Sequence, residues 1–322
     1  MSKVDYQFNQ EMTCQPIPIN DLSTYKQILS IFSQLQPKIE VLAIHQYYDN
    51  SEIEGRLYDV YQITSSSQLF VLKKSNMNEV TVYNTFLNTK NFAVPKMFGY
   101  IKKEENIWIL LEHIEGSDLK KFNHAMALSC AKNLVEIFNT YWQDKDFETN
   151  KLDNRFEQYF ERICRRAHCL KDFDKLSKAY NIFLARQKEC PRTLCNGDLL
   201  QCNALNSPKG VVIIDWGFAG IMPYALDIAR LIAHGADQDD PFYMTDELRE
   251  VFLSAVYSGL KNTSLTYEQF LWDVKLARLN ECIEFIESNL NHPDKDKDRY
   301  FEYYFVRANK LSDEILEAYQ KN

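Results

Sequence analysis

The 322-residue sequence has no uninterrupted apolar stretch close to the roughly 18 to 20 residues that a membrane-spanning helix requires. Its first fifteen residues, MSKVDYQFNQEMTCQ, lack the basic segment followed by an apolar segment that is typical of a secretory signal. It also lacks internal repeats and low-complexity linkers. We therefore expect a cytoplasmic protein with no membrane partner.

No CxxC pair occurs among the eight cysteines, which stand at irregular spacings along the chain. Disulfide frameworks and zinc sites both depend on regular cysteine spacing. The pattern instead predicts reduced, buried thiols and no metal bound through sulfur.

Positive charge is scarce in the last third of the chain. Residues 1–200 hold 25 Lys and Arg against 25 Asp and Glu, whereas residues 201–322 hold 12 against 20. The whole net charge of -8 thus comes from the last 122 residues. Phosphate backbones need a basic face, so nucleic acid is excluded as a partner, and a cationic small molecule is favoured. The alternative is a merely solvated acidic surface.

The two parts of the chain differ in hydrophobic pattern. Short β-branched and aromatic runs predict antiparallel strands, and they are preceded by a helix that begins after Asp21 and ends near Pro37. Beyond residue 115 the apolar residues recur mostly with helical spacing. We expect an α+β protein with a small antiparallel-sheet N-terminal lobe, residues 1–114, and a larger, mostly helical C-terminal lobe, residues 115–322. The expected strands are residues 39–48, 56–64 and 69–75 and two more within 92–114. A helix is expected between them at residues 78–89.

Three hard oxygen donors lie on or beside two short apolar runs, LCNGDLLQCN and VVIIDWGFAG. They are Asp198, Asn203 and Asp215. Carboxylate and amide oxygens suit magnesium, which keeps waters and bridges phosphates. Phosphoryl transfer from a nucleotide explains the set: Asn203 and Asp215 hold the metal, and Asp198 accepts the proton of an attacking hydroxyl. Taken singly, each side chain could instead stabilise a turn or cap a helix or strand by hydrogen bonds to the backbone.

Phosphates also need a fixed cation. Lys73, at the end of the third expected strand, stands six residues before Glu79 at the start of a helix, and we expect the two to pair. Lys74, which points to the other face of the strand, is the alternative partner for Glu79.

These segments resemble the aminoglycoside phosphotransferase and choline kinase superfamily, relatives of protein kinases. NGDLLQCNAL and VVIIDWGFAG are similar to the family's catalytic loop and magnesium strand, and FVLKK, NEVTVYNTFL, IWILLEHIEGSDL and PYALDIARL follow in the family's order over about two thirds of the chain. The resemblance implies a two-lobed protein-kinase-like fold and a phosphotransferase that uses ATP or GTP with Mg²⁺.

Position by position, the resemblance implies Asp198 as catalytic base and Asn203 and Asp215 as magnesium ligands. It also implies Lys73 on the nucleotide phosphates, Glu79 as its partner, a structural Asp227, and an adenine-binding hinge at Glu112, His113 and Ile114.

The sequence departs from the family at three places. The connection from Lys73 to Glu79 is short, at six residues, so Glu79 could instead pair with Lys74 or lack a lysine partner. Asn196 stands where the family usually has histidine, so an amide must orient the loop. The phosphate-covering hairpin, YYDNSEIEGRLY, has Gly55 as its only glycine, and Ser51 is its best phosphate contact.

The acceptor pocket is expected in the acidic C-terminal part. Candidate acceptor residues are Asp237, Asp239, Asp240, Glu281, Glu284 and Trp272. A cationic, aminoglycoside-like acceptor suits the carboxylates, whereas a choline-like amino alcohol would need an aromatic cage, and sugars stay open. We expect a monomer or homodimer.

Two other classes compete with a kinase. A catalytically inactive kinase-like binding protein would fit Asn196 and the acidic hairpin. A two-metal nuclease or phosphatase would need further Asp and His ligands that the sequence does not gather.

Overall fold

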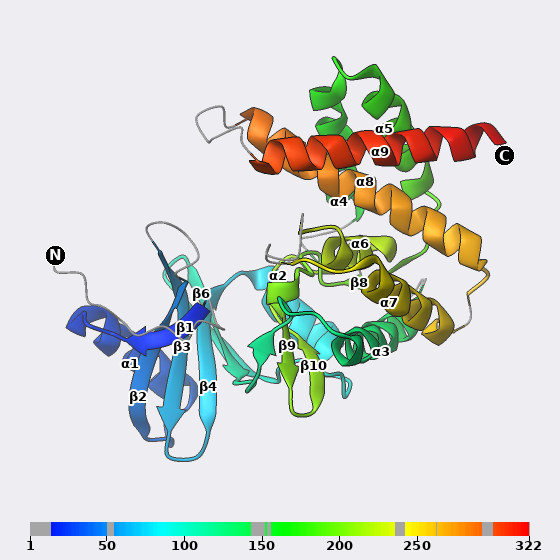
Figure 1. Cartoon of the computed structure of the whole chain (residues 1–322). Coiled ribbons are helices and arrows are strands. Elements are labelled where there is room, and N and C mark those ends of the chain that lie inside the picture. Colours follow the sequence, from blue (N-terminus) through cyan, green and yellow to red (C-terminus); the bar gives the residue numbers. More distant parts are fainter. Residues whose placement is uncertain are drawn as a thin grey trace. The chain divides into compact units, whose positions relative to one another are not determined.

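The computed structural model describes residues 14–49, 55–142, 152, 156–235, 242–261, 263–291 and 299–321. By its Cα packing the chain forms two compact units, one of Met1–Asp118 with Leu205–Gly217 and one of Leu119–Ala204 with Phe218–Asn322. The N-terminal part carries an antiparallel sheet and the C-terminal part is mainly helical, which confirms the predicted fold class (Figure 1).

The first unit is built on an antiparallel sheet of six strands in the order β1-β2-β3-β4-β6-β5. The strands are β1 (Cys14–Pro18), β2 (Val41–Asp49), β3 (Arg56–Ser65), β4 (Leu69–Ser75), β5 (Met97–Lys103) and β6 (Asn106–Glu112). Strand β1 was not predicted, because its sequence CQPIP contains two prolines. It lies at the edge of the sheet, where proline is tolerated because the missing N–H need not pair.

Helix α1 (Leu22–Leu35) covers one face of this sheet. Asp21 caps it as expected, since its carboxylate accepts the Thr24 N–H at 2.7 Å. Ile28 and Phe32 are buried at an i, i+4 spacing, and the Phe32 ring meets the Phe70 ring edge-on at 5.4 Å between centroids.

Helix α2 (Met77–Val82) follows β4 and continues as a π-helical turn at Tyr83–Leu87. The Asn76 side chain caps it by accepting the Glu79 N–H at 2.8 Å. The unit also contains β7 (Ser117–Asp118), β9 (Ala204–Ser207) and β10 (Gly210–Ile213), which form a small sheet in the order β10-β9-β7.

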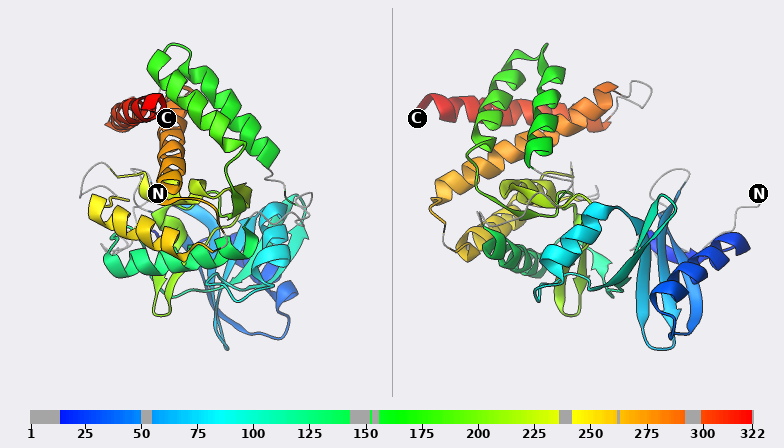
Figure 2. Two further views of the ribbon diagram at one scale, coloured as in Figure 1. Left: turned by 90° about the vertical axis from the view of Figure 1, so that its right-hand side faces the viewer. Right: turned by 180° about the vertical axis from the view of Figure 1, so that it is seen from behind.

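The second unit is mainly helical. Its long helices are α3 (His124–Tyr141), α4 (Phe156–Arg166), α5 (Asp174–Gln187), α6 (Ala225–Ile232), α7 (Asp246–Gly259), α8 (Tyr267–Asn291) and α9 (Arg299–Lys321). Figure 2 shows α8 and α9 running past each other with α4 and α5 beside them. Two short strands, β8 (Arg192–Cys195) and β11 (Gly220–Pro223), pair antiparallel beside α6. No helix in the described ranges is both long and apolar enough to cross a membrane.

Candidate active site

Lys73 and Glu79 form an ion pair in the first unit, with 3.0 Å between Nζ and Oε2. Lys73 Nζ also lies 2.8 Å from Asp215 Oδ1. Burial alone would lower the pKa of Lys73, but the charges of Glu79 and Asp215 raise it, so the ammonium stays charged. A strand, a helix and the turn after β10 thus bring one cation and two carboxylates together.

Glu79 is 1 % exposed, and its carboxylate has hydrogen-bond partners besides Lys73. Its Oε2 accepts a short hydrogen bond from the Ser75 hydroxyl, and its Oε1 accepts the Trp216 N–H at 3.2 Å. The carboxylate therefore ties the lysine strand to the turn that carries Asp215, and its desolvation is offset by these partners.

Asp215 sits in an uncommon backbone conformation, with φ of 54°. A non-glycine residue in this left-handed region persists only where its surroundings fix it, and such strain gathers at functional sites. Here the side-chain amides of Asn76 and Asn78 donate to the Gly217 carbonyl at 3.1 and 3.3 Å. The turn is thereby held with the Asp215 side chain 49 % exposed.

Lys74, the alternative to Lys73, points to the other face of β4. Its Nζ lies 3.7 Å from Asp59, and both side chains are about half exposed. A pair of this kind is a surface pair of small energetic weight. The structure therefore selects Lys73 as the lysine that contacts Glu79.

The expected hinge residues Glu112, His113 and Ile114 line a hollow of about 790 Å³ in the first unit. The Glu112 N–H is already taken by the Lys96 carbonyl at 2.8 Å. His113 Nε2 lies 2.9 Å from Gln62 Nε2, and burial lowers the His113 pKa, so a neutral imidazole accepts the Gln62 amide. Among the described residues, nothing bonds the Ile114 main chain, which leaves its N–H and C=O for a ligand.

The loop that carries Asp198 connects β8 to the 3-10 turn Gln201–Asn203 in the second unit. Gly197 has φ of 81°, and a Cβ there would come within 2.3 Å of the Phe218 carbonyl oxygen, so only glycine fits. Asp227, buried at the start of α6, accepts the N–H groups of Asn196 at 2.6 Å and Gly197 at 2.9 Å. Burial raises the pKa of Asp227 to about 7, although these two bonds oppose the shift.

Two asparagines shape the same loop. The side-chain Oδ1 of Asn196 accepts the Asp198 N–H at 3.1 Å, so a side-chain amide orients this loop. The Asn203 amide nitrogen donates to the main-chain oxygen of Asp198 at 2.7 Å and to its Oδ2 at 3.2 Å. Because that nitrogen faces two acceptors, Asn203 Oδ1 is the atom left as a metal donor, with only a long 3.8 Å contact from the Cys202 thiol.

Arg230, on α6, binds the carboxylate of Asp198. Its Nε and Nη2 donate to Asp198 Oδ1 at 3.0 and 2.7 Å. Its Nη1 donates to Glu281 Oε2 at 2.7 Å. Burial opposes the charge of Arg230, but the surrounding carboxylates raise its pKa, so it stays a fixed cation. Arg230 was not predicted from the sequence, although a lone arginine within the apolar run ALDIARLI was a visible signal.

Glu281 and Glu284, which we expected to face an acceptor, are both engaged by arginine. Glu281 is 4 % exposed, and burial would raise its pKa, but Arg230 and then His234 lower it to about 2. Glu284 Oε2 lies 2.7 Å from Arg166 Nη2, whose Nε binds Glu287 at 3.0 Å. Since Arg230 Nη1 also lies 3.4 Å from Glu284 Oε1, a continuous chain of ion pairs runs from Asp198 to α4.

The remaining expected residues fall elsewhere. Ser51, Asp237, Asp239 and Asp240 lie outside the described residues. Trp272 is half-buried on α8, nine residues before Glu281. Nine residues are about two and a half helical turns, so Trp272 points to the opposite side of α8 from Glu281.

The donor set fits magnesium. Within the described ranges, no group of three or more His, Cys, Asp or Glu side chains is arranged to hold a metal. Magnesium needs no such cage, because it binds one or two carboxylate or amide oxygens and fills its shell with water and phosphate. Asp215, half exposed, and Asn203 Oδ1 are donors of that kind.

The sequence matches the model of the phosphotransferase enzyme family over residues 50–260. The chain belongs to this family. The match confirms the resemblance drawn from the catalytic loop, and it makes the chain a kinase that acts on hydroxyl acceptors and uses a nucleotide.

Solved structures of the same fold come from several branches of the superfamily. A choline kinase from Streptococcus pneumoniae is 18% identical, with a TM-score of 0.62 over 91% of this chain and 99% of that one. An aminoglycoside phosphotransferase from Alicyclobacillus acidocaldarius subsp. acidocaldarius is 16% identical, with a TM-score of 0.58 over 91% and 95%. A third, an aminoglycoside phosphotransferase in complex with ADP and hygromycin B, is 11% identical, with a TM-score of 0.57 over 91% and 97%. No curated protein sequence matches this chain.

Proposed function

We propose that this phosphotransferase moves the γ-phosphoryl group of ATP or GTP to a hydroxyl of a small cationic acceptor, with Asp198 as the base. The observation that carries the proposal is the fixing of Asp198: Arg230 holds Oδ1, and Asn203 faces Oδ2. A carboxylate held at both oxygens on a rigid loop is suited to receive a proton in a defined direction.

The proposed step balances as an in-line transfer. The acceptor oxygen attacks the γ-phosphorus while its proton passes to Asp198, and the bond from that phosphorus to the bridging oxygen of the nucleotide breaks. The acceptor leaves as a phosphate ester, the nucleotide leaves as a diphosphate, and Asp198 later returns its proton to solvent.

Lys73 is proposed to bind the nucleotide phosphates. It is buried, charged and held by Glu79 at 3.0 Å, so it offers a fixed cation at no reorganisation cost. Asn203 and Asp215 are proposed to hold Mg²⁺, which would neutralise phosphate charge when bound. Ile114, whose main-chain groups are unpaired in the described structure, is proposed to hydrogen-bond the purine base of the nucleotide.

A surplus of carboxylates favours a cationic acceptor. The ion-pair chain contains four carboxylates, Asp198, Glu281, Glu284 and Glu287, and two guanidinium groups, Arg230 and Arg166. The carboxylates of this chain exceed its guanidinium groups by two negative charges. Glu284 and Glu287 are the more exposed members, at 38% and 29%, and would meet the acceptor's ammonium groups. One structural neighbour is an aminoglycoside phosphotransferase in complex with hygromycin B, so aminoglycosides are tested first.

The test is nucleotide diphosphate release from Mg-ATP or Mg-GTP against aminoglycosides, choline-like amino alcohols and neutral sugars. We expect release that depends on a cationic acceptor and falls when Glu284→Gln and Glu287→Gln are combined. Equal release with neutral sugars would contradict a cationic acceptor and would favour a sugar as the substrate. Nucleotide binding without release for any acceptor would favour a kinase-like binding protein.

A further inference from the structure

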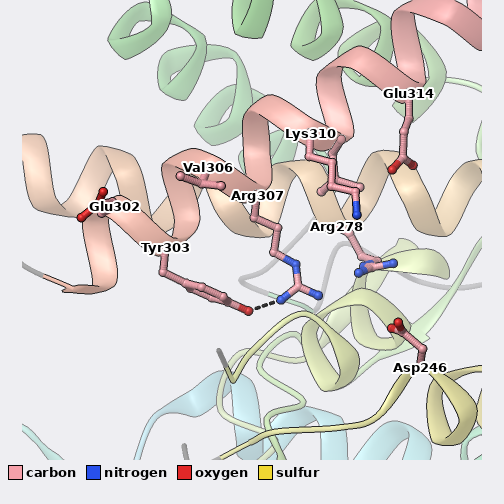
Figure 3. A pocket seen from close by; sticks show the side chains of 9 residues that line it. Asp246, Arg278, Glu302, Tyr303, Val306, Arg307, Lys310 and Glu314 are labelled. Carbon is pink, nitrogen blue, oxygen red and sulfur yellow. Dashed lines mark hydrogen bonds between the residues drawn. The ribbon is translucent and has the colours of Figure 1, made fainter. Parts of the chain in front are cut away.

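A cavity in the helical unit, distinct from the Asp198 ion-pair chain, is lined by three cationic side chains and three carboxylates. It has a volume of about 550 Å³ and lies among α7, α8 and α9 (Figure 3). Arg278 enters it from α8, and Arg307 and Lys310 enter it from α9. Figure 3 shows the three cationic ends converging on the space above Asp246.

None of these three cations forms an ion pair with a carboxylate among the described residues, although the charge of Asp246 acts on Arg278. Arg278 Nε is buried and has no hydrogen-bond partner. Arg307 donates its one hydrogen bond to the neutral hydroxyl of Tyr303, whose own proton goes to the Gly235 carbonyl at 2.8 Å.

The carboxylates that line the cavity are committed elsewhere or lie away from Arg278. Asp246 Oδ1 accepts from Arg249 Nη1 at 2.6 Å, and Glu314 Oε2 lies 2.9 Å from Lys275 Nζ. Glu302 is exposed, and Figure 3 places it at the far end of the cavity from Arg278.

Burial and the neighbouring cations disfavour the charged forms of two arginines at this cavity. Burial, with the like charges of Arg307 and Arg249, lowers the pKa of Arg278 to about 10. Burial and Arg307 also lower the pKa of Arg249. All of these groups are still charged near neutral pH, so the fold holds neighbouring cations that repel one another. A bound anion would relieve that repulsion and satisfy the unpaired guanidinium.

We propose that the cavity formed by Arg278, Arg307 and Lys310 binds a small molecule through an oxyanion, a phosphate or a carboxylate. Guanidinium groups match both anions with paired N–H donors, and the volume lies in the range of small-ligand sites. The site is separate from the proposed transfer chemistry, because its residues contact neither Asp198 nor its partner Arg230 in the described structure.

The experiment titrates the full-length chain by calorimetry and thermal shift with inorganic phosphate in one arm and citrate in the other, at constant ionic strength set with chloride. The variants are Arg278→Gln and Arg307→Gln. Arg165→Gln is the matched control, because Arg165 is an exposed arginine on α4 that does not line the cavity.

We expect at least one anion to bind the wild type and the control, and both arginine variants to bind it at least about tenfold more weakly. The arm that binds more tightly identifies the ligand as a phosphate or a carboxylate. Failure of both anions to bind, or binding that both arginine variants leave unchanged, would overturn the proposal.

Stability without added anion gives an independent check. Removing an unpaired buried charge should leave Arg278→Gln at least as stable as the wild type. A large fall in its melting temperature would mean that Arg278 already has a structural partner, and would overturn the proposal. Neither readout depends on transfer activity, so failure here is distinguishable from failure of the proposed function.

Discussion

Arg230 places both Nε and Nη2 on a single carboxylate oxygen of Asp198, at 3.0 and 2.7 Å. The same guanidinium reaches Glu281 with Nη1 at 2.7 Å. One arginine therefore fixes the proposed base and ties it to the buried middle of α8. Since Arg230 binds Asp198 through Oδ1 alone, the other oxygen keeps its orientation toward Asn203.

Replacing this arginine tests whether it positions the base. Arg230→Gln should lower kcat on the order of 10- to 100-fold and leave the KM for nucleotide nearly unchanged, because the lost contact orients Asp198. It should also destabilise the fold by roughly 3 to 5 kcal/mol, because the buried Glu281 loses its arginine partner. Kinetics well below the melting temperature separate the two effects. Arg165→Gln, an exposed arginine on α4, is the control. An unchanged kcat in Arg230→Gln would remove the positioning role.

The neighbouring lysines of β4 offer a matched pair. Lys73 is tied to Glu79 at 3.0 Å, whereas Lys74 meets only Asp59 at 3.7 Å on the surface. Lys73→Met should reduce kcat/KM for the nucleotide on the order of 100-fold or more, because a fixed cation on the phosphates is lost. Lys74→Met should stay near the wild type. Similar losses in both variants, measured by steady-state kinetics, would contradict the assignment of Lys73.

Gly197 tests the geometry of the loop. A Cβ there would approach the Phe218 carbonyl oxygen to 2.3 Å at a φ of 81°, so Gly197→Ala must displace the backbone next to Asp198. We expect a loss of roughly 1 to 3 kcal/mol in unfolding free energy and a fall in kcat. At Gly99 the nearest atom to a Cβ is a Leu35 methyl at 3.5 Å, and Gly99→Ala should keep full activity. Normal activity in Gly197→Ala would show that this backbone is not required.

Glu281 predicts a pH dependence of stability. Its pKa is lowered from 4.5 to about 2, because Arg230 and then His234 outweigh the effect of burial. A group whose folded pKa is depressed stabilises the fold above its unfolded pKa, and that contribution is lost as pH falls from about 4.5 toward 2. Denaturant unfolding at pH 3 to 7 should show a steeper acid loss for the wild type than for Glu281→Gln. Parallel curves would contradict the ion pair.

Much of the fold could be predicted from the sequence. The runs at 56–65 and 69–75 alternate between buried and more exposed residues, and the run at 41–49 is rich in β-branched and aromatic residues, both of which local pattern reveals. Helix α1 could be predicted from Asp21 as its N-cap and from the helical spacing of its apolar residues. Strand β1 could not be predicted, because its two prolines oppose a strand and only pairing with β2 makes it one.

The site was predicted in part. The order of Lys73, Asp198, Asn203 and Asp215 along the chain pointed to phosphoryl transfer before any contact was known. The partners of Glu281 and Glu284 could not be predicted, because Arg230 and Arg166 lie 51 and 118 residues away in sequence and meet them only after α4, α6 and α8 pack. Charge counting alone therefore overstated how much acidic surface is free for an acceptor.

The most direct test of the account compares the wild type with Asp198→Asn in two measurements on the same preparations: calorimetric binding of Mg-nucleotide, and transfer of the γ-phosphoryl group to the best acceptor. The substitution removes the base and keeps Lys73 and Asp215. The account predicts nucleotide affinity within a few-fold of the wild type and transfer reduced by at least about 1,000-fold. Transfer at the wild-type rate in Asp198→Asn, with nucleotide bound, would contradict the account.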